Sequence, residues 1–294
     1  MFAQGYPIME TKKLSHFRPV LKWAGGKRQL LPALINNMPD HFKGYYEPFL
    51  GGAALLTSLY SLGKIGSCII SDTNRDLFNL YVNIRENPQK LIDELNNLKF
   101  KNRKEDYYEA RNLFNSTEDP LIRSVLFIYL NRHGYNGLYR VNSRNEFNVP
   151  FGRYNNPSMP SAENILAMAQ ILQSCTLLNS DFEIAVSDAE SGDFVYFDPP
   201  YMPLNRTSYF TSYTSSGFTM EDQKRLAGIF RELTKKGVYV MESNSSSSFI
   251  RELYDGFDFL ELNARRNINT MGAKRGNVKE ILITNYSIVR QEFK

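Results

Sequence analysis

Short apolar runs alternate with segments of helical character in the first third of the chain. Residues 45–47 and 67–71 have the length and composition of buried strands. Residues 32–38 are bounded by prolines, residues 53–62 form an apolar run closed by a glycine, and residues 74–86 repeat apolar side chains at helical spacing. This alternation of strands and helices predicts the opening of a doubly wound α/β sheet.

The middle of the chain, from about residue 88 to residue 174, has a different pattern. Its apolar spacing is mostly helical and includes a second apolar run at residues 121–130. A polar loop rich in Asn, Gly and Arg, residues 132–154, interrupts the helical pattern. We therefore expect a helical insertion that carries one long polar loop.

The α/β pattern resumes after this insertion. Residues 194–197 and 237–241 predict buried strands, and between them a capping box opens a helix with apolar residues along one face. Residues 257–262 and 280–286 predict a pair of antiparallel strands. The fold class is therefore α/β, with a Rossmann-like sheet and one helical insertion.

Basic residues are clustered, although the net charge of the 294-residue chain is only +4 at pH 7. One cluster spans residues 99–104, and another, with Arg132 and Arg140 among its members, lies in the 132–154 loop. A third spans residues 264–279, which contain five basic residues and no acidic one. Such clusters favour phosphate binding, although any single cluster is more often a solvated face.

The chain shows no sign of a metal site, a secretory signal or a membrane span. Cys68 and Cys175 lie far apart in apolar surroundings, and the three histidines complete no zinc-ligand spacing. No disulfide framework is indicated, which makes a reducing compartment the expectation. Neither a signal peptide nor a membrane-spanning run is visible. We expect a soluble, cytoplasmic protein without a membrane partner, whose oligomeric state the sequence leaves open.

Two glycine pairs are candidates for ligand-binding loops. Gly51 and Gly52 stand between a predicted strand and a predicted helix, where a ligand can approach the backbone at the carboxyl ends of parallel strands. Asp72 ends the following strand about 20 residues on, where a carboxylate can bind ribose hydroxyls. The glycines lack the Gly-x-Gly-x-x-Gly spacing, which disfavours a nicotinamide cofactor. Gly-Gly-Lys at residues 25–27 lacks the spacing of a phosphate-binding loop.

Asp198, Pro199, Pro200 and Tyr201 follow a predicted apolar strand and are the strongest chemical signal. The lone pair of the adenine N6 amine is delocalised into the ring, so that amine is a poor nucleophile. The Asp198 carboxylate and the Pro199 carbonyl can accept its two hydrogens and localise the lone pair on nitrogen. Pro200 stiffens the turn, and Tyr201 can stack on a base rotated out of the duplex.

Methylation of cytosine at carbon-5 is disfavoured. That reaction needs a covalent thiolate nucleophile, which such enzymes place in a Pro-Cys pair. Neither cysteine of this chain follows a proline. Direct transfer to an amine needs no nucleophilic side chain, which agrees with the residues present.

Four motifs together resemble the Dam-type adenine-N6 DNA methyltransferases of the alpha group, especially those of GATC restriction–modification systems. The motifs are Lys-Trp-Ala-Gly-Gly-Lys at 22–27, Glu-Pro-Phe-Leu-Gly-Gly at 47–52, Ser-Asp-Thr-Asn at 71–74 and Asp-Pro-Pro-Tyr at 198–201. The loop between residues 130 and 154 also matches closely. The resemblance covers nearly the whole chain past about residue 17, and the longer N-terminal tail departs from it.

This resemblance implies a methyl donor, S-adenosylmethionine, and three sets of site residues. The catalytic set is Asp198, Pro199, Pro200 and Tyr201. The cofactor-binding set is Trp23, Lys27, Glu47, Gly51, Gly52, Asp72, Asp181, Phe182 and Asp198. The DNA-binding set is Lys22, Tyr135, Asn136, Leu138, Arg140, Arg265, Lys274 and Arg275.

The resemblance also implies a division of labour between domains. Residues 16–88 and 175–294 would form the catalytic and cofactor-binding domain, and residues 89–174 a target-recognition domain that reads double-stranded DNA with its 132–154 loop. Within that loop Arg140 can donate two hydrogen bonds to guanine, the commonest specific major-groove contact. A restriction endonuclease acting independently on the same site would be the partner of such an enzyme.

Two other classes of protein remain open at this point. Methyltransferases that act on RNA adenine or on protein amides are related, but they usually carry Asn where Asp198 stands and lack the recognition insertion. A non-catalytic DNA-binding module could retain the same fold. The intact Asp-Pro-Pro-Tyr motif and the intact glycine loop argue against that second alternative.

Overall fold

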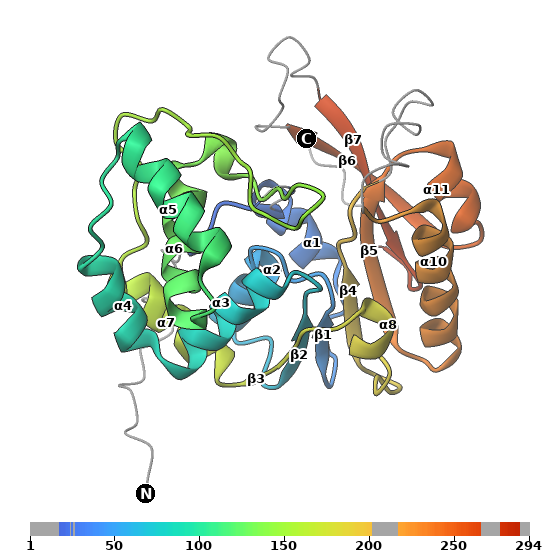
Figure 1. Cartoon of the computed structure of the whole chain (residues 1–294). Coiled ribbons are helices and arrows are strands. Elements are labelled where there is room, and N and C mark those ends of the chain that lie inside the picture. Colours follow the sequence, from blue (N-terminus) through green and yellow to red (C-terminus); the bar gives the residue numbers. More distant parts are fainter. Residues whose placement is uncertain (1–17, 24, 26, 202–216, 266–276, 289–294) are drawn as a thin grey trace, which may run out of the picture. The chain divides into compact units, whose positions relative to one another are not determined.

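The computed structural model describes residues 18–23, 25, 27–201, 217–265 and 277–288 (Figure 1), with the side chains of 263–265 and 277–279 left aside. The chain forms two compact units, each assembled from three separate stretches. We call one the helical unit; it comprises Met1–Gly26, Gly51–Gly66 and Thr73–Asn179. The other, the sheet unit, comprises Lys27–Leu50, Ser67–Asp72 and Ser180–Lys294.

The sheet unit contains the strands β2-β1-β4-β5-β7-β6, in this order, of a seven-stranded sheet. Four of them run parallel to one another: β1 (Tyr45–Glu47), β2 (Cys68–Ser71), β4 (Phe194–Phe197) and β5 (Tyr239–Ser245). β7 (Asn277–Thr284) runs antiparallel to β5 on one side and to β6 (Asp258–Arg265) on the other. The predicted α/β fold and the predicted antiparallel pair are therefore confirmed.

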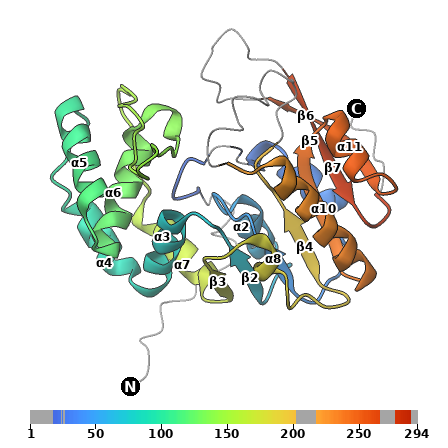
Figure 2. The same ribbon diagram turned by 45° about the vertical axis from the view of Figure 1, so that its right-hand side comes forward.

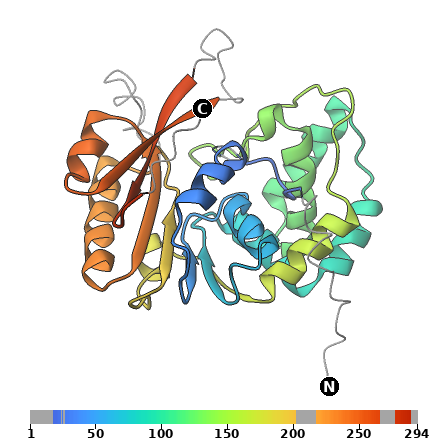
Figure 3. The same ribbon diagram turned by 180° about the vertical axis from the view of Figure 1, so that it is seen from behind.

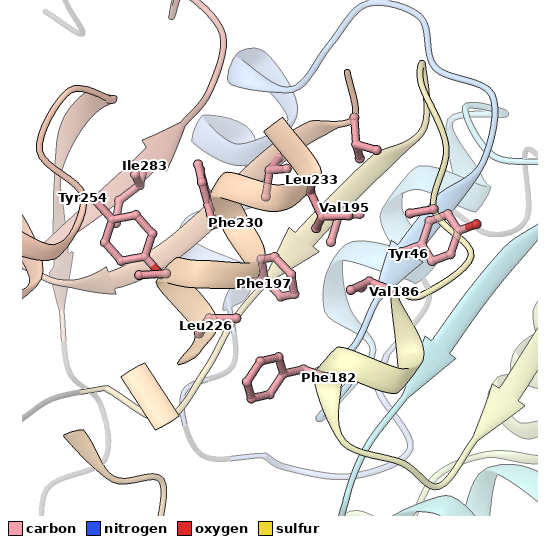
Figure 4. Close-up of a cluster of buried hydrophobic side chains, with 14 of the residues drawn as sticks. Tyr46, Phe182, Val186, Val195, Phe197, Leu226, Phe230, Leu233, Tyr254 and Ile283 are labelled. Atoms are coloured by element: carbon pink, nitrogen blue, oxygen red, sulfur yellow. The ribbon is translucent and has the colours of Figure 1, made fainter. Parts of the chain in front are cut away.

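Every residue of β4 is buried, as expected for a parallel strand covered on both faces. α10 (Met220–Lys235) begins at the capping box of Thr219 and Asp222. Figure 2 shows α10 lying along β4 and β5, and Figure 4 shows Leu226 and Phe230 of this helix in one apolar cluster with Phe197. The short helices of this unit are α1 (Leu31–Asn37), which Figure 3 shows beside β1, α8 (Phe182–Ala185) and α11 (Ser248–Leu253).

The helical unit is organised around α6 (Pro120–His133), whose residues from Ser124 to His133 are all buried. A helix that is buried on all sides belongs at the centre of its unit. Its neighbours are α3 (Arg75–Glu86), α4 (Pro88–Asn96) and α5 (Lys104–Ser116). The unit also contains α2 (Ala54–Ser61), α7 (Ala162–Leu172) and β3 (Cys175–Leu178). The predicted helical character of the middle of the chain is thereby confirmed.

Several predicted boundaries are wrong, including the end of β6 and both ends of β7, and two of the errors involve buried or paired polar residues. α6 continues to His133, so the polar loop begins after Arg132, because the polar end of this helix is buried rather than solvated. β5 begins at Tyr239 and continues to Ser245, four residues beyond the predicted end. Its polar second half pairs along its whole length with β7, a long-range pairing that apolar patterning does not reveal.

From the sequence, three features are expected to be absent: a disulfide, a membrane span and a metal site. The absence of a disulfide is wrong: both Cys68 and Cys175, the first residues of β2 and β3, are disulfide-bonded. The sequence did not indicate a disulfide because the two cysteines are far apart along the chain. Among the described residues no helix is long and apolar enough to cross a membrane. The same residues contain no group of three or more His, Cys, Asp or Glu side chains placed to hold a metal ion.

Candidate active site

Three acidic residues lie at the carboxyl ends of neighbouring parallel strands in the sheet unit. Glu47 is the last residue of β1, Asp72 follows β2, and Asp198 follows β4. Glu47 is buried and accepts a hydrogen bond of 2.8 Å from the hydroxyl of Tyr45. Because β1 pairs with both β2 and β4 in parallel, all three carboxylates emerge at the same edge of the sheet.

Asp198 belongs to a cluster of four side chains that we call the Asp198 cluster. Lys27 Nζ lies 2.8 Å from Asp198 Oδ1 and 4.6 Å from the centre of the Tyr201 ring. The hydroxyl of Tyr201 donates a 2.7 Å hydrogen bond to Oε2 of Glu280, a buried residue of β7. Lys27 therefore bridges the carboxylate of the Asp-Pro-Pro-Tyr motif and its aromatic ring.

The electrostatics of this cluster favour a carboxylate that titrates close to neutrality. Burial raises the pKa of Asp198 to about 6; Lys27 opposes that shift and Glu280 adds to it. Burial, with the nearby charges of Asp198 and Glu280, raises the pKa of Tyr201 well above its usual value. Above about pH 6 the cluster thus holds an ionised Asp198, a hydrogen-bond acceptor, beside a neutral Tyr201, a donor.

Two residues of the sheet unit contact the motif and were missed by the sequence analysis. Glu280 holds the Tyr201 hydroxyl, and Gln223 on α10 donates a 3.0 Å hydrogen bond to the carbonyl of Pro200. Both lie far from residues 198–201 in the sequence and in segments assigned only to strand and helix. No local pattern marks them, because sheet register and helix packing bring them to the turn.

The glycine pair of the second motif packs against Trp23 within the helical unit. Gly51 has a left-handed backbone with φ of 49°, and a Cβ added there would lie only 2.8 Å from Cδ1 of Trp23. A Cβ on Gly52 would lie 3.2 Å from Cβ of Trp23. The Gly51 carbonyl accepts a 2.7 Å hydrogen bond from the hydroxyl of Tyr81. Glycine is thus required at residue 51 both by its backbone conformation and by the indole.

Asp181 and Phe182 have structural partners within the sheet unit. Asp181 caps α8 and forms an ion pair with Arg225 at 2.8 Å. Phe182 is buried, and its ring stacks on Phe49 with 5.6 Å between ring centres. Their predicted role in cofactor binding stays a prediction.

The polar loop of the helical unit contains a tethered hairpin that presents Arg140. An antiparallel bridge joins Val141 to Phe147, and the N–H of Asn148 donates to the Arg140 carbonyl at 3.0 Å. The exposed Arg140 guanidinium donates to Asn148 through Nε at 2.6 Å and through Nη2 at 3.2 Å. These bonds use two of its five N–H donors.

The remaining loop residues of the DNA-binding set gather near Tyr154. The backbone N–H of Asn136, a residue with φ of 55°, donates a 2.9 Å hydrogen bond to the hydroxyl of Tyr154. Nζ of Lys22 lies 4.6 Å from the centre of the same ring, and burial lowers the pKa of this lysine. Tyr135 is exposed and Leu138 is half-buried. The structure therefore brings Lys22 to the loop that carries Asn136.

Of the other basic residues that the sequence analysis named, one is buried and three have side chains outside the described structure. Arg132, a member of the basic cluster in the predicted loop, is buried and donates hydrogen bonds to the backbone carbonyls of Pro19 and Val20. It holds the chain before Lys22 and is not a solvated phosphate ligand. Lys274 and Arg275 lie outside the described residues, as does the side chain of Arg265 at the end of β6.

The parallel sheet with an inserted antiparallel β7 and acidic strand ends is that of the S-adenosylmethionine-dependent methyltransferase class. Residues 23–268 match the family described as D12 class N6 adenine-specific DNA methyltransferase, and the chain belongs to this family. It is therefore an adenine-specific DNA methyltransferase. The family assignment disfavours the two alternatives left open by the sequence, a methyltransferase acting on RNA adenine or protein amides and a non-catalytic DNA-binding module.

Curated relatives are similar over nearly their whole length. The Type II methyltransferase M1.LlaDCHI of Lactococcus lactis subsp. cremoris is 44% identical over 95% of this chain and 99% of its own. The Type II methyltransferase M.MjaIII of Methanocaldococcus jannaschii is 43% identical over 92% of this chain and 99% of its own. The DNA adenine methylase of Escherichia coli K12 is 38% identical over 90% and 94%.

The acidic residues of the sheet unit fit S-adenosylmethionine, the cofactor that this family uses. S-adenosylmethionine carries ribose hydroxyls, an ammonium group and a sulfonium, all of which favour carboxylate partners. Glu47, Asp72 and Asp198 supply three carboxylates at one edge of the sheet. Asp72 lies directly after β2, the strand that follows the glycine pair, and its binding to the ribose stays a prediction.

Proposed function

We propose that this enzyme methylates N6 of the adenine in GATC within double-stranded DNA and protects host DNA in a cytoplasmic restriction–modification system. An endonuclease acting independently on the same site would be its partner. The names of two relatives, Type II methyltransferases, support the biological role. The observation that carries the chemistry is the Asp198 cluster, in which a buried lysine aligns a carboxylate at the end of β4.

The geometry of the turn supports a direct transfer to the amine. Bound S-adenosylmethionine supplies an electrophilic methyl group. The Asp198 carboxylate accepts a hydrogen bond from one N–H of the target amine and the Pro199 carbonyl accepts one from the other, so the lone pair is available to the methyl group. The N–CH3 bond forms as the S–CH3 bond breaks, and the methylated amine loses its surplus proton to the Asp198 carboxylate or to water. The base must be rotated out of the duplex to reach these acceptors, and Tyr201 offers a ring on which it can stack.

We further propose that the two activities are divided along the chain. Residues 16–88 and 175–294 would bind the cofactor and catalyse transfer, and residues 89–174 would recognise the target. The hairpin that presents Arg140 supports this assignment, because a tethered hairpin can place one side chain in the major groove without first becoming ordered.

The pH dependence of the reaction tests the role of Asp198. The folded pKa of about 6 means that the acceptor form is present above pH 6 and is lost as the pH falls through that value. We expect kcat/KM, which reports groups of the free enzyme, to fall about tenfold per pH unit below 6. The variant Asp198→Asn, which does not titrate, should show residual activity without this break. A break below pH 5 would contradict the assignment.

Substitution of Arg140 tests the target sequence. We expect wild-type enzyme to methylate GATC duplexes in preference to all single-base variants of that site. Arg140→Ala should relax discrimination at one base pair, by about 1–3 kcal/mol, because it removes a bidentate contact to guanine. Initial rates on GATC and its variants, for both proteins, measure this effect.

Arg144→Ala is the matched control for Arg140→Ala. Arg144 is exposed on the same hairpin, where it pairs with Glu146 at 3.1 Å. Its loss should leave discrimination unchanged. If Arg140→Ala weakens all duplexes alike and flattens the salt dependence, Arg140 is a phosphate contact instead. A wild-type enzyme that ignores GATC would refute the proposed target and leave the adenine chemistry intact.

A further inference from the structure

Gln223 ends a chain of buried polar side chains that runs from the core of the sheet unit to the Asp-Pro-Pro-Tyr turn. The hydroxyl of Tyr254 donates to Oε2 of Glu242 at 2.5 Å, and Nδ2 of Asn244 donates to Oε1 of the same carboxylate at 2.8 Å. Nδ2 of Asn244 also donates to Oε1 of Gln223 at 3.0 Å. Nε2 of Gln223 then donates to the carbonyl of Pro200 at 3.0 Å.

Stability alone does not account for this chain. Tyr254, Glu242, Asn244 and Gln223 are all fully buried, and Figure 4 shows Tyr254 beside the apolar side chains of Phe230 and Ile283. Burial raises the pKa of Glu242 to about 7, which reflects the unfavourable placement of a carboxylate in this environment. Apolar side chains of similar volume are often neutral or stabilising at such positions. The presence of this buried series of polar side chains is therefore not explained by packing alone.

The Glu242 carboxylate determines which group donates and which accepts in this series of hydrogen bonds. An ionised Glu242 only accepts hydrogen bonds, so the amide of Asn244 must turn its NH2 group toward it. That NH2 group also faces Gln223, which must therefore present its oxygen to Asn244. The Oδ1 of Asn244 accepts the N–H of Ser245 at 2.8 Å, which fixes the same orientation independently. As a result Gln223 has its NH2 group aimed at the Pro200 carbonyl.

The hydrogen bond from Gln223 to the Pro200 carbonyl restricts ψ of Pro200, a backbone torsion of the turn that the prolines do not restrict. The proline rings hold φ of Pro199 and Pro200 near about −65°. Because Asp198 and Pro199 each precede a proline, their ψ angles are confined to the extended region. The angle ψ of Pro200 is not restricted in this way, and it sets both the direction of the Pro200 carbonyl and the path of the chain into Tyr201. A donor on that carbonyl therefore fixes where Tyr201 stands relative to Asp198.

We propose that Gln223 is a positioning residue for methyl transfer, oriented by Asn244, Glu242 and Tyr254, that sets the placement of Tyr201 relative to Asp198. The proposal rests on the proposed roles of Asp198 and Tyr201 but not on the target sequence. Gln223 touches neither base nor cofactor in this scheme. Its effect should appear in turnover and not in the binding of either substrate.

The first test replaces Gln223 by Leu, which keeps the approximate volume and removes both hydrogen bonds. With genomic DNA that lacks adenine methylation as substrate, at pH 8, we expect kcat to fall about tenfold or more. The KM for S-adenosylmethionine and the duplex Kd should stay within about twofold, a difference too small to report a lost contact. Asn285→Leu is the control, because Asn285 holds the opposite end of β5 through Val240 N–H and the Val238 carbonyl.

The second test separates positioning from folding. Glu242→Gln keeps the shape but allows the amides to rotate, so kcat should fall several-fold while the melting temperature is unchanged or higher. In the double variant Gln223→Leu/Glu242→Gln the loss should not exceed that of Gln223→Leu alone, because both act through one chain. The proposal would be overturned if the fold-losses in kcat of the two single variants multiply in the double variant. A Gln223→Leu turnover within about twofold of the Asn285→Leu control would also overturn it. Asp198→Ala is assayed in parallel: if it retains activity, the proposed function fails whatever Gln223 does.

Discussion

Asp198→Ala is expected to lower the rate of methyl transfer to DNA by about 100-fold or more, in line with the loss of one preorganised group that stabilises a transition state. Asp198 is the side-chain acceptor for the target amine, and Lys27 holds it in place at 2.8 Å. Its function is needed only as the amine attacks, so kcat should fall while duplex affinity changes little. Single-turnover rates with tritiated cofactor and a separate duplex-binding titration measure the two quantities.

Asp188→Ala supplies the control for this experiment. Asp188 is an exposed carboxylate of the same unit, and its removal changes the net charge in the same way. It should leave turnover unchanged. If Asp198→Ala keeps more than about a tenth of wild-type turnover, equivalent to about 1.4 kcal/mol in the barrier, Asp198 is not the acceptor.

Asp76→Ala is expected to destabilise the helical unit by about 3 kcal/mol, because it leaves a poorly solvated arginine without its partner. Buried Asp76 accepts hydrogen bonds from Arg123 Nε at 2.5 Å and Nη2 at 3.2 Å. It also accepts the hydroxyl of Tyr139 at 2.7 Å. Loss of roughly 3 kcal/mol should lower the melting temperature by roughly 6–12 °C.

The Tyr139 contact gives this prediction a second consequence. Tyr139 lies next to Arg140 and packs against Trp23 at 6.0 Å between ring centres. Tyr139→Phe removes only the hydroxyl and should cost about 1 kcal/mol. Glu86→Ala, which removes the exposed partner of Arg85, should have no measurable effect. A melting temperature of Asp76→Ala within about 2 °C of wild type, less than 1 kcal/mol on this scale, would contradict a structural role for the Asp76–Arg123 pair.

Local pattern predicted the elements whose apolar side chains repeat at a fixed period. The helix from Arg75 to Glu86, the strand from Phe194 to Phe197 and the capping box before α10 are found where the sequence places them. The errors occur where polar residues are buried. Arg132 can be buried because it donates hydrogen bonds to the backbone carbonyls of Pro19 and Val20. The polar second half of β5 can be buried because it pairs with β7.

The residues of the candidate site likewise include some that the sequence predicts and some that it does not. Asp72 and Asp198 were predicted because an acidic residue after an apolar strand is a local signal, and the structure brings both to one edge of the sheet. Glu280 and Gln223 carry no such signal. Glu280 faces the site because the register pairs it with Ser245, and Gln223 because α10 packs on β5. Their positions depend on the completed sheet and could not be obtained from spacing along the chain.

The position of β7 has a consequence for biosynthesis. This strand follows β6 in the sequence, yet it lies between β5 and β6, and it contributes the carboxylate that holds Tyr201. A nascent chain that stops after β6 has β5 with an unpaired edge and Tyr201 without Glu280. β7 must therefore leave the ribosome before the enzyme can act, so translation products truncated before β7 should accumulate as inactive chains with an exposed strand edge.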